Sequence, residues 1–414
     1  MIVKDYIKTF EKHGMGMFVH FGLYSILEKG EWIYNFLDEN GKKDYPSLPS
    51  KFNPDKNWAR DLVSTAKAAG CKYITLTTRH HDGFSLYDTQ GLNDYDAPHA
   101  LCGRDLVREF VDACREQDIV PFFYHTLLDW YVKDYNDNFP KYLEYLRKSV
   151  ELLCKNYGKI GGIWFDGMWN KWNADWEEDA LYATIRKYQP EAMIINNTGM
   201  GERGALGHIE LDSVTFERGK PQPINLEDSP KYVASEMCQV YGVHWGYAKN
   251  DFCYKSLVDI INDLCVCRRY GANFLMNVGP RPDGSLRPID KAMFETLGEW
   301  VALNEEALRA PRPSGIAVEG KSDNFILENG NDLYLFCHNM EMRGDANVVL
   351  DDSTSDDSAY INRFALDKKI TSAQWLDSGE ELSFTQKDGK VCLITPAFKY
   401  GEHYVVRVAK LTVK

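Results

Sequence analysis

The sequence predicts an α/β fold, a (β/α)8-like (TIM) barrel that is irregular after the fifth strand, followed by a C-terminal antiparallel β-sandwich. Three observations indicate this fold. Short apolar runs alternate with amphipathic segments over the first 310 residues, the helical signal is poor between residues 198 and 240, and apolar and polar residues alternate after residue 312. Strands buried on both faces give continuous apolar runs, and strands with one solvated face give alternating apolar and polar residues.

Eight apolar runs are predicted to form the barrel strands, because continuous apolar runs are typical of strands that are buried on both faces. Helical patterns lie between several runs, and Gly70 and Gly271 close two of these patterns in the position typical of a helix end. A last helix at 290–308 is expected to close the barrel. The weakest run is the seventh. The runs are 15–22, 73–79, 119–125, 161–167, 192–198, 213–217, 241–247 and 272–279.

Two domains are predicted, a barrel domain over 1–312 and a β-sandwich domain over 313–414. In the second domain, Asp388 and Gly389 form an Asp-Gly pair, which is a strong signal for a tight β-hairpin. The alternating runs of this domain are 332–340, 346–352, 369–398 and 402–413.

The composition argues against several classes of partner. Nucleic acids and anionic membranes bind basic patches, whereas this chain has a formal net charge of -13 and no run rich in Lys and Arg. No basic N-terminal region precedes an apolar core, and no run of about 18 apolar residues occurs, so a cytoplasmic protein is expected. The ten cysteines form no CxxC pair, which favours free thiols. The sequence leaves a homo-oligomer open.

Polar and aromatic residues follow almost every predicted strand. In a (β/α)8 barrel the C-terminal ends of the strands carry the active site, so these residues are expected to face one pocket. Each has a structural alternative: a lone His is more often a hydrogen-bonded structural residue, and Asp166 could instead cap the next helix. The residues are His20, Arg79, His80, His81, Asp82, Tyr124, His125, Asp166, Asn196, Asn197, Thr198, Glu217, Trp245 and Asn277.

Two of these strand-end residues, Asp166 and Glu217, are carboxylates on different predicted strands. Two carboxyl groups facing one pocket are what glycoside hydrolysis requires, one to attack or stabilise the anomeric carbon and one to donate a proton to the leaving oxygen. The aromatic content of 13% gives weak support to sugar binding, because sugar faces stack on aromatic rings.

Five motifs give the chain a family resemblance. "MGMFVHFGLYS", "TLTTRHHDGFSLYDT", "GGIWFDG", "DSVTFE" and "NFLMNVGPRPDGSL" occur in this order. Together they resemble the α-L-fucosidases of glycoside hydrolase family 29. The resemblance runs from about residue 14 to 313, which covers the whole predicted barrel, whereas the C-terminal domain carries no motif of its own.

The resemblance implies a retaining, exo-acting α-L-fucosidase that acts on small fucosylated oligosaccharides or glycoconjugates without a metal or other cofactor. It implies that Asp166 is the nucleophile of a covalent fucosyl intermediate and that Glu217 is the general acid/base. The two carboxyl groups are then expected about 5–5.5 Å apart. The implied substrate pocket consists of His20, Glu31, Trp32, His80, His81, Tyr124, Trp164 and Trp245.

The chain departs from the family pattern at one position and leaves one role open. Many members carry Arg after the paired Asn of the fifth strand, whereas this chain has Thr198; Arg203 or Arg218 could supply that charge, or none is needed. Glu236 is the competing candidate for the acid/base. We interpret it as a structural residue or as a residue behind the pocket wall.

Two other functions are weighed against this one. A fucose-binding barrel without activity is disfavoured, because both Asp166 and Glu217 are retained. A metal-dependent barrel hydrolase would place His-x-His on the first strand, where the chain has only His20, and the adjacent His80 and His81 cannot readily bind one ion together.

The linkage and the aglycone stay open. Trp172 and Trp176, in the segment 170–179, form either an aglycone platform or part of a helix that packs on the barrel.

Overall fold

The computed structural model describes residues 3–198, 202–224, 226, 229–320, 323–341, 359–399 and 401–414. The chain divides into two compact units, one of residues 1–255 and 272–296 and one of residues 256–271 and 297–414. The domain boundary between residues 312 and 313 stays a prediction.

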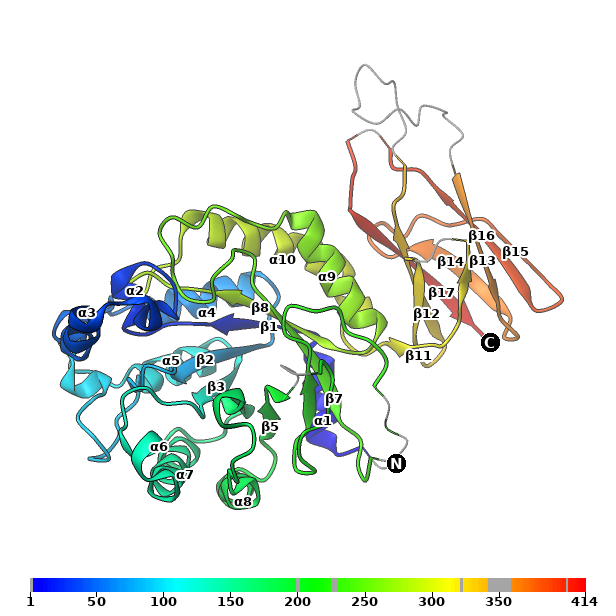
Figure 1. The fold of residues 1–414 in the computed structure, drawn as a ribbon. Coiled ribbons are helices and arrows are strands. Elements are labelled where there is room, and N and C mark those ends of the chain that lie inside the picture. Colours follow the sequence, from blue (N-terminus) through cyan, green and yellow to red (C-terminus); the bar gives the residue numbers. More distant parts are fainter. Residues whose placement is uncertain are drawn as a thin grey trace. The chain divides into compact units, whose positions relative to one another are not determined.

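The first unit holds a closed barrel of parallel strands that follow one another in chain order (Figure 1). The ring closes because the first strand pairs with both the second and the last. This arrangement confirms the predicted barrel. The strands are β1 (Met15–Val19), β2 (Tyr73–Arg79), β3 (Val120–Thr126), β4 (Gly162–Asp166), β5 (Met193–Asn196), β6 (Ser213–Thr215), β7 (Ala234–Gln239) and β8 (Asn273–Val278).

The helices begin where the sequence offers caps. Asp105 accepts a hydrogen bond from the backbone N–H of Arg108, and Ser256 and Asp259 form a capping box. The α-helices are α1 (Asp5–His13), α2 (Tyr24–Leu27), α3 (Glu39–Asp44), α4 (Trp58–Ala68), α5 (Leu106–Glu116), α6 (Asp134–Asp137), α7 (Phe139–Asn156), α8 (Glu178–Tyr188), α9 (Leu257–Arg269) and α10 (Pro288–Leu308). Short 3-10 turns are η1 (Ile33–Phe36), η2 (Tyr45–Lys51), η3 (Ala97–His99) and η4 (Met168–Lys171).

Helix α1 packs against side chains that fill the barrel. Its apolar face buries Ile7 and Phe10, and the ring of Phe10 lies 5.5 Å from that of Tyr73 and 5.8 Å from that of Phe122. The same cluster of buried side chains continues to Trp164. The barrel is therefore a packed core and not a channel.

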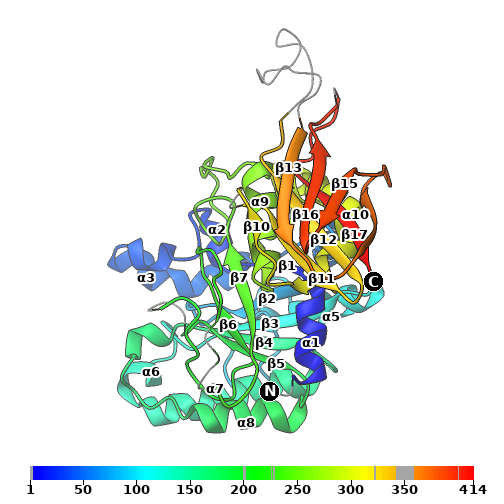
Figure 2. The ribbon, with the colours of Figure 1, turned by 90° about the vertical axis from the view of Figure 1, so that its right-hand side faces the viewer.

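The barrel is irregular after its fifth strand, as predicted. No helix lies between β5, β6 and β7 in the parts of these connections that the structure describes (Figure 2). Strand β6 is only three residues long, and its pairing with β5 is limited to Ile195 and Ser213.

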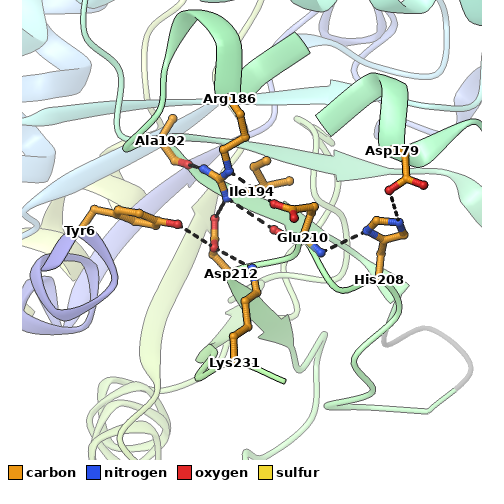
Figure 3. Close-up of polar contacts among 9 residues, drawn as sticks. All are labelled: Tyr6, Asp179, Arg186, Ala192, Ile194, His208, Glu210, Asp212 and Lys231. Atoms are coloured by element: carbon orange, nitrogen blue, oxygen red, sulfur yellow. Dashed lines mark hydrogen bonds and ion pairs between the residues drawn. The ribbon is translucent and has the colours of Figure 1, made fainter. Parts of the chain in front are cut away.

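A buried polar cluster lies where β6 begins (Figure 3). The carboxylate of Asp212 is fully buried, and Oδ1 accepts hydrogen bonds from Tyr6 and Lys231. Oδ2 accepts from Arg186 and from the backbone N–H of Ile194. One carboxylate thereby joins α1, α8, β5 and the segments that lead into β6 and β7, where the chain lacks the usual connecting helices.

The seventh strand was predicted at the wrong place. The structure forms β7 from residues 234–239, whereas residues 241–247 form the loop that follows it. The strand was hidden because it carries Ser235, Glu236 and Gln239, which interrupt the apolar run expected of a buried strand. In the loop, Trp245 lines a cavity and Gly246 packs against Tyr24. The aromatic residues of segment 241–247 therefore reflect burial without strand pairing.

The second unit contains two antiparallel sheets, as expected for the C-terminal sandwich. Their orders are β10-β13-β16-β15 and β14-β17-β12-β11-β9. Asp388 and Gly389 have φ values of 50° and 71° and connect β15 to β16, which confirms the predicted hairpin. The predicted run at 346–352 lies outside the described residues. The strands are β9 (Arg312–Pro313), β10 (Val318–Glu319), β11 (Phe325–Asn329), β12 (Asp332–His338), β13 (Ala359–Ala365), β14 (Ile370–Trp375), β15 (Phe384–Lys387), β16 (Lys390–Pro396) and β17 (Val406–Val413).

The described residues include all ten cysteines, and each is a free thiol. None of the described helices is both long enough and apolar enough to cross a membrane.

Candidate active site

A cavity of about 260 Å³ lies among residues from the C-terminal ends of the barrel strands. Seven of the fourteen strand-end residues that were expected to face one pocket line it, and seven do not: Arg79, Asp82, His125, Asn196, Asn197, Thr198 and Asn277. The cavity brings together nine of the ten residues that the resemblance implies for the catalytic pair and the substrate pocket. The tenth, Glu31, is buried beside it, where its carboxylate accepts a hydrogen bond of 2.8 Å from the backbone N–H of Gly246. The lining residues are Phe18, His20, Trp32, His80, His81, Tyr124, Trp164, Asp166, Trp169, Glu217, Cys238 and Trp245.

Asp166 is the last residue of β4, and its carboxylate is held from both sides. Oδ2 accepts a hydrogen bond of 2.9 Å from the hydroxyl of Tyr124, and Oδ1 accepts one of 3.1 Å from the amide Nδ2 of Asn197. Gly167 follows with φ of 100°, a conformation that favours glycine and turns the chain away from the strand. Asp166 is therefore fixed at the cavity wall and does not cap a helix.

Glu217 follows β6, and its carboxylate lies close to that of Asp166. Its Oε2 accepts a hydrogen bond of 2.6 Å from Nδ2 of Asn197, the same nitrogen that lies 3.1 Å from Oδ1 of Asp166. These two oxygens are therefore less than about 6 Å apart, which is compatible with the separation of about 5–5.5 Å in retaining glycosidases and short for most inverting ones.

Burial and the neighbouring carboxylate both affect the pKa of Asp166. Burial, and then the nearby charge of Glu217, raise the pKa of Asp166 to about 8, and its hydrogen bonds to Asn197 and Tyr124 oppose this rise. Like charges this close in a buried site disfavour double ionisation. At neutral pH the pair is therefore expected to hold one proton and one negative charge.

The histidines of the cavity are neutral, because burial lowers the pKa of His20 and of His81 to about 3. Nδ1 of His20 lies 2.7 Å from Oδ1 of Asn277, whose Nδ2 donates to the carbonyl of Trp245. Because Oδ1 is an acceptor, Nδ1 of His20 carries the proton and Nε2 keeps a lone pair. The position of the proton on His81 can be assigned in the same way.

His81 bonds through Nδ1 to Oγ1 of Thr126 at 2.7 Å, and that hydroxyl donates its own proton to the carbonyl of Leu128. Nδ1 of His81 is therefore the donor, and Nε2 is an acceptor that lies 3.7 Å from Oδ2 of Asp166. Two cavity histidines thus offer acceptors to hydroxyl groups.

Aromatic rings form much of the cavity wall. The rings of Tyr124 and Trp164 stack at 5.8 Å, and the rings of His80 and Tyr124 stack at 5.6 Å. His20 lies 5.1 Å from the ring of Trp245, and Trp32 lies 5.3 Å from that of His81. Such a wall suits the apolar face of a sugar.

Glu236, the competing carboxylate, lies inside β7 and is not among the residues that line the cavity. Its Oε1 accepts a hydrogen bond of 3.0 Å from Nε1 of Trp164, and its Oε2 accepts one from the hydroxyl of Tyr73. Burial raises its pKa to about 7. These contacts are those of a residue that holds Trp164 from behind.

A family model described as alpha-L-fucosidase matches residues 3–306 of this chain. The chain belongs to the α-L-fucosidase family. It is therefore a glycoside hydrolase, and the barrel with its strand-end cavity is the part that the family model covers.

Individual relatives agree with this membership. The tissue alpha-L-fucosidase of Bos taurus is 30% identical over 346 residues, which cover 76% of this chain and 71% of that protein. The solved alpha-L-fucosidase isoenzyme 1 from Paenibacillus thiaminolyticus has a TM-score of 0.82 and 27% identity, and the match covers 99% of each chain. A GH29 alpha-L-fucosidase from Bacteroides thetaiotaomicron has a TM-score of 0.80 and 22% identity, covers 100% of this chain and 97% of that chain, and shows the shared fold.

At the position where many α-L-fucosidases carry Arg, Thr198 donates a hydrogen bond to the carbonyl of Ala205. Arg203 donates through Nε to the backbone carbonyl of Glu217, and so supports the loop of that residue. Arg218 lies over the ring of Trp245 at 5.1 Å. The two arginines thus flank Glu217, one through the backbone and one through the aromatic wall.

Three residues that line the cavity were not in the predicted set. Phe18 and Cys238 lie within β1 and β7 and look like ordinary core residues in the sequence, so no signal distinguished them. Trp169 follows Asp166 by three residues, and its place after β4 was the available signal. Asn197, which bonds to both carboxylates, was among the predicted strand-end residues.

The two tryptophans of segment 170–179 differ: one is packed on the barrel, and the other is exposed and keeps open the interpretation as an aglycone platform. Trp176 is buried and packs on Phe139 with ring centres 5.0 Å apart, as a residue packed on the barrel would. Trp172 is 53% exposed.

The described residues contain no group of three His, Cys, Asp or Glu side chains arranged to hold a metal ion. Independence from metal stays a prediction.

Proposed function

We propose that this glycoside hydrolase is a retaining, exo-acting α-L-fucosidase that removes terminal α-L-fucose by double displacement, with Asp166 as nucleophile and Glu217 as general acid/base. The observation that carries the proposal is the pair itself: two carboxylates bonded to one amide nitrogen at the wall of a small aromatic cavity. The short separation supports direct attack, because an inverting enzyme needs room for a water molecule between carboxylate and sugar.

In the first step, the carboxylate of Asp166 attacks the anomeric carbon while the bond to the leaving oxygen breaks. Glu217 donates its proton to that oxygen, so the negative charge passes from Asp166 to Glu217. The step needs the charge on Asp166 and the proton on Glu217, and the hydrogen bonds that Asp166 accepts from Tyr124 and Asn197 favour its ionised form.

In the second step, Glu217 takes a proton from an incoming water molecule, which attacks the same carbon and releases Asp166. Two displacements at one carbon retain the anomeric configuration. The B. thetaiotaomicron enzyme has been solved as a trapped covalent intermediate with 2-fluoro-fucosyl fluoride. For the present chain, the covalent route rests on the proposed roles of its own two carboxylates.

The cavity is proposed to bind one sugar ring. Its volume of about 260 Å³ is below the ~300–1,000 Å³ of pockets for larger ligands, which favours release of a terminal residue. Acceptors on His20 and His81 would pair with fucose hydroxyls, and Trp164 and Trp245 would contact the C6 methyl. Glu31 and Trp32, with His80 and Tyr124, complete the proposed recognition set.

The decisive experiment follows hydrolysis of an aryl α-L-fucoside and of a branched Lewis-type trisaccharide by proton NMR. We expect α-configured fucose as the first product, and the ratio of the two rates assigns the linkage preference. Initial formation of β-fucose would refute retention. No turnover of either substrate would favour the sugar-binding alternative.

The residue roles are tested with Asp166→Ala and Glu217→Ala, and with Glu191→Gln as a control at an exposed carboxylate. Asp166→Ala should lose turnover. Glu217→Ala should lose it for a poor leaving group but still release fluoride from α-L-fucosyl fluoride in the first turnover, because fluoride leaves without protonation, whereas the second step should slow without its general base. Full activity of Asp166→Ala would remove it from the mechanism.

A further inference from the structure

Asn197 occupies the space between the two carboxylates of the proposed mechanism. Its side chain is 2% exposed, and Nδ2 lies 2.6 Å from Oε2 of Glu217 and 3.1 Å from Oδ1 of Asp166. Its backbone N–H bonds to the carbonyl of Phe165 at 2.9 Å, so the backbone is tied to β4. An amide NH2 has two protons and can serve both carboxylates at once.

The orientation of this amide is set by Thr215. The hydroxyl of Thr215, in β6, lies 3.0 Å from Oδ1 of Asn197 and must be the donor, because that oxygen carries no proton. The hydroxyl is buried, at 1% exposure. A flipped amide would turn its carbonyl oxygen toward two carboxyl groups that share one proton, so it would lose at least one of its two bonds to them, and the NH2 end therefore faces the pair.

We propose that Asn197, oriented by Thr215, is a positioning residue that holds Asp166 and Glu217 at the separation required for double displacement and stabilises whichever of them carries the negative charge. The proposal rests on the proposed function. In the first step the charge leaves Asp166, as its oxygen bonds to carbon, and arrives on Glu217, as its proton goes to the leaving oxygen. One N–H of the NH2 group donates to Asp166 and the other donates to Glu217, so a donor is present wherever the charge lies and the side chain of Asn197 need not move.

The neighbouring residues explain why this task falls to Asn197. Asn196, the other member of the pair, points the opposite way and donates to the hydroxyl of Tyr182 at 3.0 Å. Successive side chains of a strand alternate between its two faces, so only one of the two can reach the cavity. Thr198 is engaged with the carbonyl of Ala205.

The test measures kcat/KM against pH for Asn197→Ala, Thr215→Val and Thr215→Ser on an aryl α-L-fucoside. Loss of a donor to an ionised carboxylate raises its pKa, so both limbs of the profile should move to higher pH in Asn197→Ala and in Thr215→Val. We expect kcat/KM at the optimum to fall by about 10²-fold and about tenfold, respectively. Thr215→Ser keeps the hydroxyl and should retain the wild-type limbs.

A residue that merely packed would lower activity without moving the limbs. Unshifted limbs in both Asn197→Ala and Thr215→Val would therefore overturn the proposal, as would wild-type kcat/KM in either. Thr215→Val conserves the shape of the side chain, so it decides the matter if Asn197→Ala does not fold. Asp166→Ala is measured beside them. If Asp166→Ala keeps its turnover, the proposed function fails. If Asp166→Ala is inactive but the limbs of Asn197→Ala and Thr215→Val are unshifted, only the role of Asn197 is refuted.

Discussion

The buried carboxylate of Asp212 should stabilise the barrel, and Asp212→Asn is the most direct test. The change conserves shape but replaces one acceptor oxygen by a donor NH2. Oδ1 now accepts from Tyr6 and Lys231, and Oδ2 accepts from Arg186 and a backbone N–H. In either orientation the new NH2 group must face two donors.

The structure sets the size of the effect. Breaking a buried ion pair by removing one partner costs about 3–5 kcal/mol. The lower end applies here, because Arg186 and Lys231 are 19% and 18% exposed and Arg186 also lies 3.7 Å from Glu210. With about 2 cal/mol/K per residue over the barrel unit, a loss of about 3 kcal/mol lowers Tm by roughly 5 °C.

The assay is thermal unfolding by calorimetry, with Glu116→Gln as the matched control. Glu116 pairs with Arg60 at 2.8 Å, but the two side chains are 56% and 64% exposed, so its loss should change stability by less than about 1 kcal/mol. Equal Tm values for Asp212→Asn and Glu116→Gln would refute the reasoning, and so would a more stable Asp212→Asn.

Three further outcomes are expected. Burial, and then the charge of Glu217, raise the pKa of Asp166 to about 8; Glu217→Gln removes that charge, so this pKa should fall and the acid limb of kcat/KM for α-L-fucosyl fluoride should move to lower pH. Glu236→Gln should lower kcat/KM by about tenfold but keep the wild-type dependence on leaving-group pKa, whereas an acid/base variant would steepen it. Gly389→Ala places a side chain at φ of 71° and should destabilise the second unit by about 1–2 kcal/mol in denaturant unfolding.

The sequence predicted most strands because their burial is expressed in their own residues. Strand β2 is buried at every position, and its residues form a continuous run of β-branched and apolar side chains ending at Arg79. The hairpin at Asp388 and Gly389 was equally local. Strand β7 could not be found in this way, since Glu236 is tolerated inside the barrel only by bonds to Tyr73 and Trp164, which are distant in the sequence.

The residues of the candidate site that lie at strand ends could be predicted from the sequence. Asp166 and Glu217 follow strands, so the barrel rule alone brought them together. Asn197 was visible only as one of two adjacent Asn, and its inward direction depends on the register of β5. The place of Glu31 beside the cavity depends on its bond to Gly246, which lies in the loop after β7, and no local pattern encodes that contact.

The weak pairing of β5 with β6 has a mechanical consequence. The strand of the proposed nucleophile, β4, is joined to that of the proposed acid/base, β6, through β5, and β5 pairs with β6 only at Ile195 and Ser213. Local opening should begin at this seam, so backbone amides of β6 should exchange with solvent sooner than those of β2 or β3. Asp166 and Glu217, the proposed catalytic pair, therefore lie on either side of this weak strand pairing, and the side chain of Asn197 bonds to both.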